Sequence, residues 1–364
     1  MSARTDRIVH CAYLTGGNPY GLSLAERALG YCSECCSVGR NPFGYASDKC
    51  FSGNKLLAKF RLLFYVLRRA KVIHYNNGAS ILASPMSDDV HGLCKHVKNL
   101  LNPVALLVEL LAMKFLGKHI VVTYQGSDAR PTTVSWMLCG GQSRFGAASF
   151  DARMADVARR VMILIFSAVA ERIYYLNPDL AAYLPRNSVF KPYAHVDWRK
   201  VRECRTGNRR LRIVHAPTDR RVKGSAFVIE AIERLRSSGY EFDFTLVENM
   251  QYGDAMKAYE MADILVDQLM IGWYGGLAVE LMAMGKCVVC YLRERDMVCI
   301  PEEMAKDIPI CNATPDSVYN VLCNLLEHPD LVLEFGRKGR EYAMKWHDPQ
   351  TIAGSILKDL QCRT

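Results

Sequence analysis

Short apolar segments alternate with longer amphipathic segments along the first half of the chain. Each apolar run has the length of a strand and ends in a glycine or polar turn, and the next stretch repeats apolar residues every three or four positions. This pattern predicts alternating strands and helices. The expected strands are Ile8–Leu14, Lys71–Tyr75, Lys118–Tyr124 and Arg172–Leu176, and the expected helices are Leu22–Leu29, Asn54–Ala70, Pro103–Phe115 and Ala152–Val169.

The same alternation begins again after the irregular, basic stretch 187–210, which we interpret as a linker between two domains. Alternating strands and helices favour parallel sheets that bind ligands at the carboxyl ends of their strands. Helices are also expected near Pro315–Glu327, Asp330–Lys345 and Pro349–Leu360. The second series predicts strands Leu211–Pro217, Phe242–Glu248, Asp263–Gln268 and Cys287–Leu292, and helices Ser225–Ser237, Asp254–Met261 and Leu277–Met284.

The composition is that of an ordinary globular protein, with 50% hydrophobic and 23% charged residues among 364. It excludes fibrous, low-complexity and disordered chains, and the length favours two domains. Residues 1–200 hold 25 basic and 13 acidic side chains, a net charge of +12, whereas the remainder is slightly acidic. The basic half predicts an anionic partner such as a membrane surface, a phosphorylated ligand or nucleic acid, with a solvated surface as an equal alternative.

The fourteen cysteines do not indicate a disulfide scaffold. No apolar signal-peptide core follows the first residues, so we expect a cytoplasmic protein with reduced thiols. The pairs Cys32/Cys35 and Cys287/Cys290 lack the spacing of a zinc site, so no metal is expected. The longest apolar runs, Val104–Met113 and Val161–Ala170, are too short to span a bilayer and predict buried helices.

The strongest candidate chemistry flanks the expected helix Leu277–Met284. The preceding strand ends in Asp267, the pair Gly275-Gly276 opens the helix, and Glu280 lies one turn inside it. Amides at such a helix start face an anion with the helix dipole behind them, and a carboxylate there can accept hydrogen bonds from a ribose. The pattern suits a nucleotide diphosphate, and a packing turn followed by a first-turn acid is the alternative.

The stretch Glu280–Val289, ELMAMGKCVV, resembles the E-A-M-A-x-G-x-P-V-V element of retaining family 4 glycosyltransferases, whose fold is GT-B. The resemblance covers most of the chain and implies two Rossmann-like parallel-sheet domains, residues 1–195 and 196–345, with a cleft between them. Residues 346–364 would form a crossover helix that packs on the first domain. Further matching segments are the Gly16-Gly17 loop, Leu176–Leu180 for S-P-x-L, His215–Gly224 for R-x4-K-G, and Trp346–Pro349.

The resemblance implies an enzyme that moves a sugar from a UDP- or GDP-linked donor to an acceptor hydroxyl with retention of configuration, without a metal or cofactor. The acceptor would be a glycan, a lipid-linked molecule or a small molecule. Lys223 would neutralise the donor diphosphate, and Glu280 would hold the ribose. The implied catalytic residues are Lys223, Glu280, Gln125 and Asp128, and the donor-binding residues are Gly16, Gly17, Thr218, Arg220, Arg221, Lys223, Asp267, Gly275, Gly276, Leu277 and Glu280.

Three positions depart from the family pattern. Gly272 stands where the first glutamate of E-x7-E is expected, Thr218 where the arginine of R-x4-K is expected, and Gln125 where a histidine is common. Asp267 would substitute for the missing carboxylate, and the arginines after Thr218 for the missing cation. Asp128 is either a sugar contact or a loop cap.

These departures leave two alternatives open, a catalytically silent nucleotide-sugar-binding protein and a sugar-nucleotide epimerase. The cations around the expected helix Asn54–Ala70 either dock on an anionic membrane surface or flank a core helix. No motif for nucleic-acid binding is present. These cations are Lys55, Lys59, Arg61, Arg68, Arg69 and Lys71.

Overall fold

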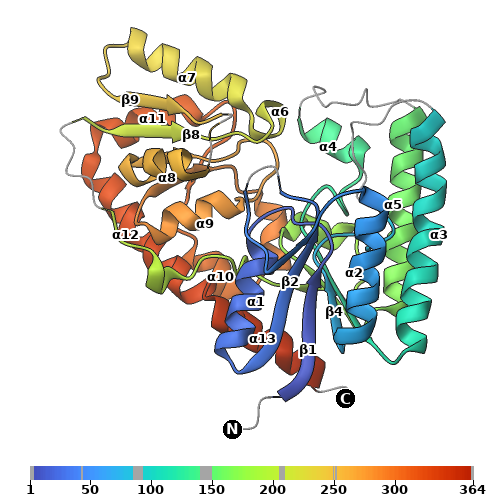
Figure 1. The fold of residues 1–364 in the computed structure, drawn as a ribbon. Coiled ribbons are helices and arrows are strands. Elements are labelled where there is room, and N and C mark those ends of the chain that lie inside the picture. The colour runs from blue at the N-terminus through green and yellow to red at the C-terminus, as the bar shows by residue number, and fades with distance from the viewer. Residues whose placement is uncertain are drawn as a thin grey trace. The chain divides into compact units, whose positions relative to one another are not determined.

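The computed structural model describes residues 4–41, 44–84, 93–139, 150–204, 210–248, 250 and 252–361, and the chain forms two compact units (Figure 1). The first unit comprises Met1–Met137, Arg144–His195 and Pro349–Thr364. The second comprises Leu138–Ser143 and Val196–Asp348. Each unit is an α/β structure built on a parallel sheet.

The first unit holds a seven-stranded sheet in the order β3-β2-β1-β4-β5-β6-β7. Every pairing in it is parallel. Sequence patterning predicted β1, β4, β5 and β6 but not β2, because Cys, Ser and Glu alternate there without a clear apolar run. The strands are β1 (Arg4–Cys11), β2 (Tyr31–Val38), β3 (Lys49–Phe51), β4 (Val72–Tyr75), β5 (His119–Tyr124), β6 (Arg172–Tyr175) and β7 (Val189–Phe190).

Helices cover both faces of this sheet. Helices α1 (Asn18–Ala28) and α13 (Pro349–Gln361) pack on one face, where Leu22 and Ile352 join the same core cluster. Helices α2 (Lys55–Arg69), α3 (Leu93–Phe115) and α5 (Phe150–Val169) pack on the other. The unit also contains α4 (Thr132–Leu138) except for its last residue, and a 3-10 turn at Pro178–Ala182.

Residues 104–113 and 161–169 are helical as expected, but the expectation that these helices are buried is wrong. Leu106 and Leu110 of α3 are buried against the sheet, whereas Val104 and Val108 are 58% and 59% exposed. Leu164 of α5 is likewise 60% exposed. A single layer of helices on a sheet buries only one side of each helix. No helix among the described residues is long and apolar enough to cross a membrane.

The second unit holds a five-stranded parallel sheet in the order β12-β11-β10-β8-β9. Its strands are β8 (Arg212–His215), β9 (Asp243–Leu246), β10 (Ile264–Val266), β11 (Cys287–Cys290) and β12 (Cys311–Asn312). Its helices are α6 (Arg220–Lys223), α7 (Ser225–Ser237), α8 (Tyr252–Met261), α9 (Gly276–Ala283), α10 (Glu302–Asp307), α11 (Val318–Glu327) and α12 (Pro329–Trp346), with 3-10 turns at Trp198–Lys200 and Glu294–Cys299.

The two C-x-x-C pairs lie along strands rather than in loops. Cys32 and Cys35 belong to β2, and Cys287 and Cys290 span β11. Residues three apart on a strand point to opposite faces of the sheet, so neither pair presents its two thiols to one ion.

Helix α12 packs against α9 and β11 through Gly336. A Cβ at Gly336 would lie 2.2 Å from the carbonyl oxygen of Gly285, an atom of the backbone that cannot rotate away. We expect Gly336→Ala to lower the free energy of unfolding by about 2–3 kcal/mol through overpacking, measured by urea denaturation. Gly253→Ala in α8 is the control, because nothing lies within 4 Å of its added Cβ, and an equal loss in both variants would contradict this account.

Candidate functional site

The loop after β8 forms the first part of the candidate donor site. The Asp219 side chain caps the short helix α6 by accepting hydrogen bonds from the amides of Arg221 at 2.9 Å and Val222 at 3.5 Å. Gly224 ends α6 with φ +74°, so that α7 starts at once. Lys223, the last residue of α6, is thereby held at the carboxyl end of the sheet, and its carbonyl accepts from the Leu269 amide.

A three-part polar contact joins this loop to the residue after β10 and to the start of α9. Lys223 Nζ donates to Asp267 Oδ1, and the amide of Gly275 donates to Asp267 Oδ2 at 2.7 Å. The Asp267 side chain is only 1% exposed, and that of Lys223 is 12% exposed. An ammonium has three N–H groups, so Lys223 retains donors for a ligand anion while Asp267 fixes its position.

Gly275 lies beside the lysine at the start of α9. It is the N-cap residue without a side-chain cap, and a Cβ added there would lie 3.4 Å from Lys223 Nζ. Gly276 and Leu277 occupy the first turn of α9, where amides lack intrahelical acceptors. The predicted amide cradle and the predicted lysine therefore lie together at one helix N-terminus, a favourable place for a diphosphate. Glu280 is half-buried on the same helix.

The other cations of the loop between β8 and α7 are more exposed than Lys223. Arg220 Nε donates to Glu248 Oε1 at 2.7 Å and holds the pKa of that carboxyl below its ordinary value. Arg221 lies 3.9 Å from Asp219, and Thr218 is exposed beside this cap. Exposed ion pairs are screened by solvent, so Lys223 is the cation best placed to act on a ligand.

His215 is a supporting residue that sequence patterning did not single out. It is fully buried at the end of β8, with Nδ1 at 2.7 Å from the Val266 carbonyl and Nε2 at 2.7 Å from Ser225 Oγ. Burial lowers its pKa. These contacts tie β8 to β10 and to the start of α7. They therefore fix the two ends of the loop that carries Lys223. A histidine at the end of an apolar strand was the available signal.

Gly272, where the family pattern places a glutamate, has a backbone that only glycine adopts easily. Its φ is +89°, and an added Cβ would lie 2.8 Å from the Cβ of Arg293. The Arg293 guanidinium donates to the Ile271 carbonyl at 2.8 Å and to Asp296 at 3.0 Å. The loop is thus built around this arginine, and the carboxylate of E-x7-E has no place in it.

Two aromatic residues fix the remainder of this loop. Trp273 and Tyr274 are buried and stacked with their ring centroids 4.3 Å apart. The Tyr274 hydroxyl lies 3.0 Å from Tyr342 of α12 and 3.0 Å from His347 Nε2. His347 belongs to the segment that resembled the family's last element, and here it anchors the loop that leads to Gly275.

In the first unit, the predicted glycine loop precedes α1. Gly17 is the N-cap, and His195 packs 3.4 Å from the position of an added Cβ. The Asn18 side chain accepts from the Ala194 amide at 2.6 Å, which ties the start of α1 to the segment that follows β7. Gly16 has no atom near its Cβ position, so the loop remains open on that side.

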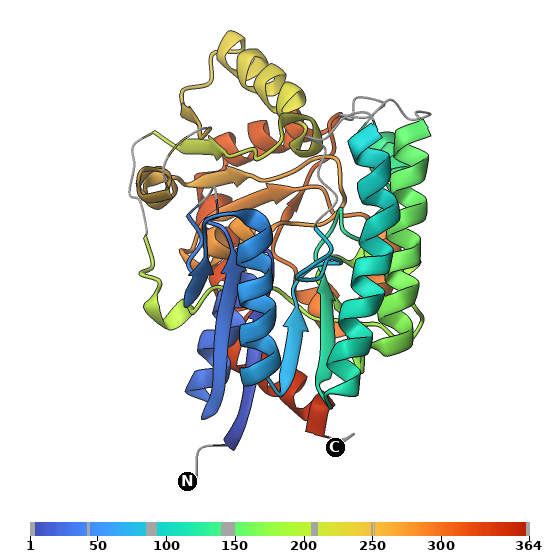
Figure 2. The ribbon, with the colours of Figure 1, turned by 45° about the vertical axis from the view of Figure 1, so that its right-hand side comes forward.

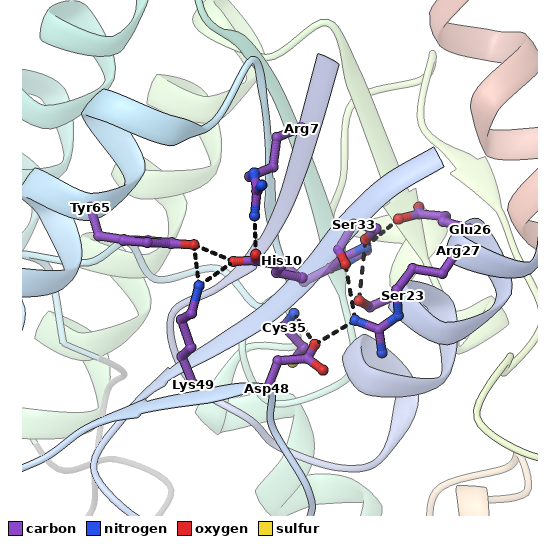
Figure 3. Close-up of polar contacts among 11 residues, drawn as sticks. Arg7, His10, Ser23, Glu26, Arg27, Ser33, Cys35, Asp48, Lys49 and Tyr65 are labelled. Atoms are coloured by element: carbon purple, nitrogen blue, oxygen red, sulfur yellow. Dashed lines mark hydrogen bonds and ion pairs between the residues drawn. The ribbon is translucent and has the colours of Figure 1, made fainter. Parts of the chain in front are cut away.

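A buried contact between His10 and Glu26 joins β1 to α1 (Figure 3). His10 Nε2 lies 2.9 Å from Glu26 Oε2, and His74 of the neighbouring strand packs 4.7 Å from the His10 ring. Among the described residues, these three form the group that could hold a metal ion. However, the nitrogen of His10 that faces this group is already bound to Glu26, and His74 Nε2 lies 2.7 Å from Thr123 Oγ1. We interpret the cluster as a structural tie.

Gln125 and Asp128 lie in the loop after β5. Asp128 accepts from the amides of Gln125 at 3.0 Å, Gly126 at 2.6 Å and Gly78 at 3.0 Å. Burial raises the pKa of this carboxyl, whereas the donated amides act in the opposite sense. The side-chain nitrogen of Gln125, Nε2, donates to the backbone carbonyl of Asn76. This geometry is that of a loop cap, and a contact of either residue with a sugar stays a prediction.

The fold is similar to that of several solved structures. Sucrose-phosphate synthase from Thermosynechococcus elongatus superposes with a TM-score of 0.61 at 14% identity, over 99% of this chain and 100% of that chain. HepE from Anabaena in complex with UDP gives 0.60 at 11% identity, over 98% and 100%. An α-glucosyltransferase in complex with UDP and a 13-mer DNA gives 0.58 at 11% identity, over 98% and 99%.

These likenesses concern the fold, since the identities are low. The two parallel-sheet α/β domains are those of the GT-B fold, which confirms the fold class expected from the sequence. No protein-family model matches the chain, and no curated protein matches its sequence.

Proposed function

We propose that the protein is a glycosyltransferase that transfers a sugar from a nucleotide-diphosphate sugar to an acceptor hydroxyl. The contact of Lys223 with Asp267 and Gly275 carries this proposal, because it places a partly exposed cation at the open start of α9. HepE in complex with UDP and with UDP-glucose has a similar fold and supports a UDP-linked donor. A GDP-linked sugar is the other candidate donor.

The chemistry follows from the charge that develops on the donor. When the bond between the anomeric carbon and the diphosphate breaks, negative charge accumulates on the departing oxygen. Lys223 and the amides of Gly276 and Leu277 would stabilise that charge without a divalent cation. Retention of configuration is proposed from the resemblance of Glu280–Val289 to family 4 enzymes, and the acceptor is proposed to be a glycan, a lipid-linked molecule or a small molecule in the cytoplasm.

Glu280 provides the test of the donor site. We expect UDP- or GDP-sugars to raise the melting temperature of the wild-type protein, because a ligand that binds only the native state stabilises it. Glu280→Gln should weaken donor binding about ten- to a hundredfold by removing a charged hydrogen-bond acceptor. Thermal shift across a panel of nucleotide sugars measures both, with Glu302→Gln, at an 82% exposed side chain on α10, as the control. No shift with any nucleotide sugar would refute the donor site.

A silent nucleotide-sugar-binding protein is the second candidate, favoured by the backbone at Gly272 that excludes the family's glutamate. Donor binding without turnover across a broad acceptor panel would support it. An epimerase would consume the donor with no acceptor present, so assays with and without acceptor separate the three functions.

A further inference from the structure

Helix α3 exposes a continuous apolar stripe. The exposed residues follow one another at intervals of four and three positions, so they lie along one side of the helix. The opposite side carries Leu106, Leu110 and Met113, which are buried against the sheet. The stripe consists of Val97, Leu101, Val104, Val108, Leu111 and Phe115, with exposed fractions between 46% and 91%.

Helices α2 and α5 extend this surface on the same face of the sheet. In α2, Ala58, Leu62 and Val66 are buried while four large apolar side chains project outward. Figure 2 shows α3 and α5 side by side as two long helices, and the two helices pack against each other. The added residues are Leu56, Leu57, Phe60 and Phe64 of α2, and Val157, Val161 and Leu164 of α5. Together with the α3 stripe we call this surface the apolar face.

The charges around the apolar face on α2 and α3 are positive. Helix α2 contains no acidic residue, and the acidic residue of α3, Glu109, is buried and bound to Tyr75 and Ser80. The Arg68 guanidinium lies 4.5 Å from the centre of the exposed Phe64 ring, so a cation sits directly beside one of the apolar side chains. The exposed cations on and next to α2 are Lys55, Arg61, Arg68, Arg69 and Lys71.

We propose that the apolar face docks on the surface of an anionic lipid bilayer, with α2 and α3 lying in the plane of the headgroups. Apolar side chains with flanking cations, as on α2, are what such a surface binds. A second copy would bring the same cations together and repel. Exposed apolar side chains on packed helices, as on α3 and α5, mark an interaction site. This inference goes beyond the proposed transfer and does not depend on it.

Flotation of the full-length protein with vesicles tests the docking directly, without donor or acceptor. We expect binding to phosphatidylcholine vesicles that contain about a third phosphatidylglycerol, little binding to phosphatidylcholine alone, and weaker binding at high salt. The triple variant Val104→Ser, Val108→Ser and Leu111→Ser should bind at least about tenfold more weakly, because it removes apolar surface that enters the bilayer. Its melting temperature should not fall, since all three side chains are exposed.

Two further variants make the result specific. Arg61→Gln, Arg68→Gln and Arg69→Gln together should reduce binding to anionic vesicles and its salt dependence. Leu333→Ser, at a 58% exposed leucine of α12 in the second unit, should leave binding unchanged. Equal binding of the wild type and both triple variants, or no binding to anionic vesicles, would overturn the proposal. A dimer in vesicle-free solution that the serine variant abolishes would assign the face to a second copy and would also overturn it.

Discussion

Replacing Lys223 by Ala is expected to lower kcat/KM for sugar transfer by about a thousandfold, the effect of removing one preorganised group that stabilises developing charge. Lys223 is the cation held closest to the start of α9, and the neighbouring Arg220 is engaged by Glu248. Steady-state kinetics with the donor found by thermal shift measures the change. Retention of more than about a fifth of the wild-type kcat/KM would contradict the assigned role.

The same substitution leaves the buried Asp267 carboxylate with the Gly275 amide but without its cation, so it also lowers stability. The double variant Lys223→Ala, Asp267→Asn separates the two effects. We expect it to recover much of the lost melting temperature while transfer stays as low as in the single variant. Lys257→Ala is the control, because this 76% exposed lysine of α8 lies outside the candidate site, and it should leave kcat/KM unchanged.

Introducing the family's glutamate, Gly272→Glu, is expected to destabilise the protein by about 3 kcal/mol rather than to improve catalysis. A non-glycine residue at φ +89° costs about 1–2 kcal/mol. The contact of the new Cβ with the Arg293 Cβ, at 2.8 Å, adds about 1–3 kcal/mol of overpacking. Chemical denaturation measures the free energy of unfolding, and transfer activity is followed in parallel.

Gly239→Ala isolates the backbone cost in this experiment. Gly239 has φ +84°, but nothing lies within 4 Å of its Cβ position. It should therefore lose only about 1 kcal/mol, whereas Gly272→Ala loses more because it also meets Arg293. Equal losses at the two glycines would show that crowding by Arg293 is unimportant, and a gain of transfer in Gly272→Glu would show that the loop accommodates the glutamate.

The alternation of strand and helix was readable because it is local. A strand repeats with period two and a helix with period 3.6, and β1, β4, β5 and β6 each carry enough apolar residues to show it. Strand β2, with the sequence YCSECCSV, was missed since its Ser and Glu side chains obscure the period. Its burial comes from the strands and helices on either side, which the local sequence does not show.

Candidate site residues near one another in the sequence were also readable. The pair Gly275-Gly276 before an apolar helix, with Glu280 one turn in, predicted the helix start that the structure contains. Lys223 was singled out only through its resemblance to a family motif. Its contact with Asp267 joins residues 44 positions apart in the sequence, and a local sequence pattern does not extend over that separation.

The sequence by itself determined the α/β class, the parallel sheets and the polar residues at the ends of their strands, because these depend on short-range periodicity and on the direction of the chain. Only the tertiary structure decided which of those residues meet. The pairing of β8 with β10 brings Lys223 to Asp267, and the packing of Arg293 sets the backbone of Gly272. It also decided which side of α3 stays exposed, since burial depends on what packs against a helix and the helix's own sequence does not specify its neighbours.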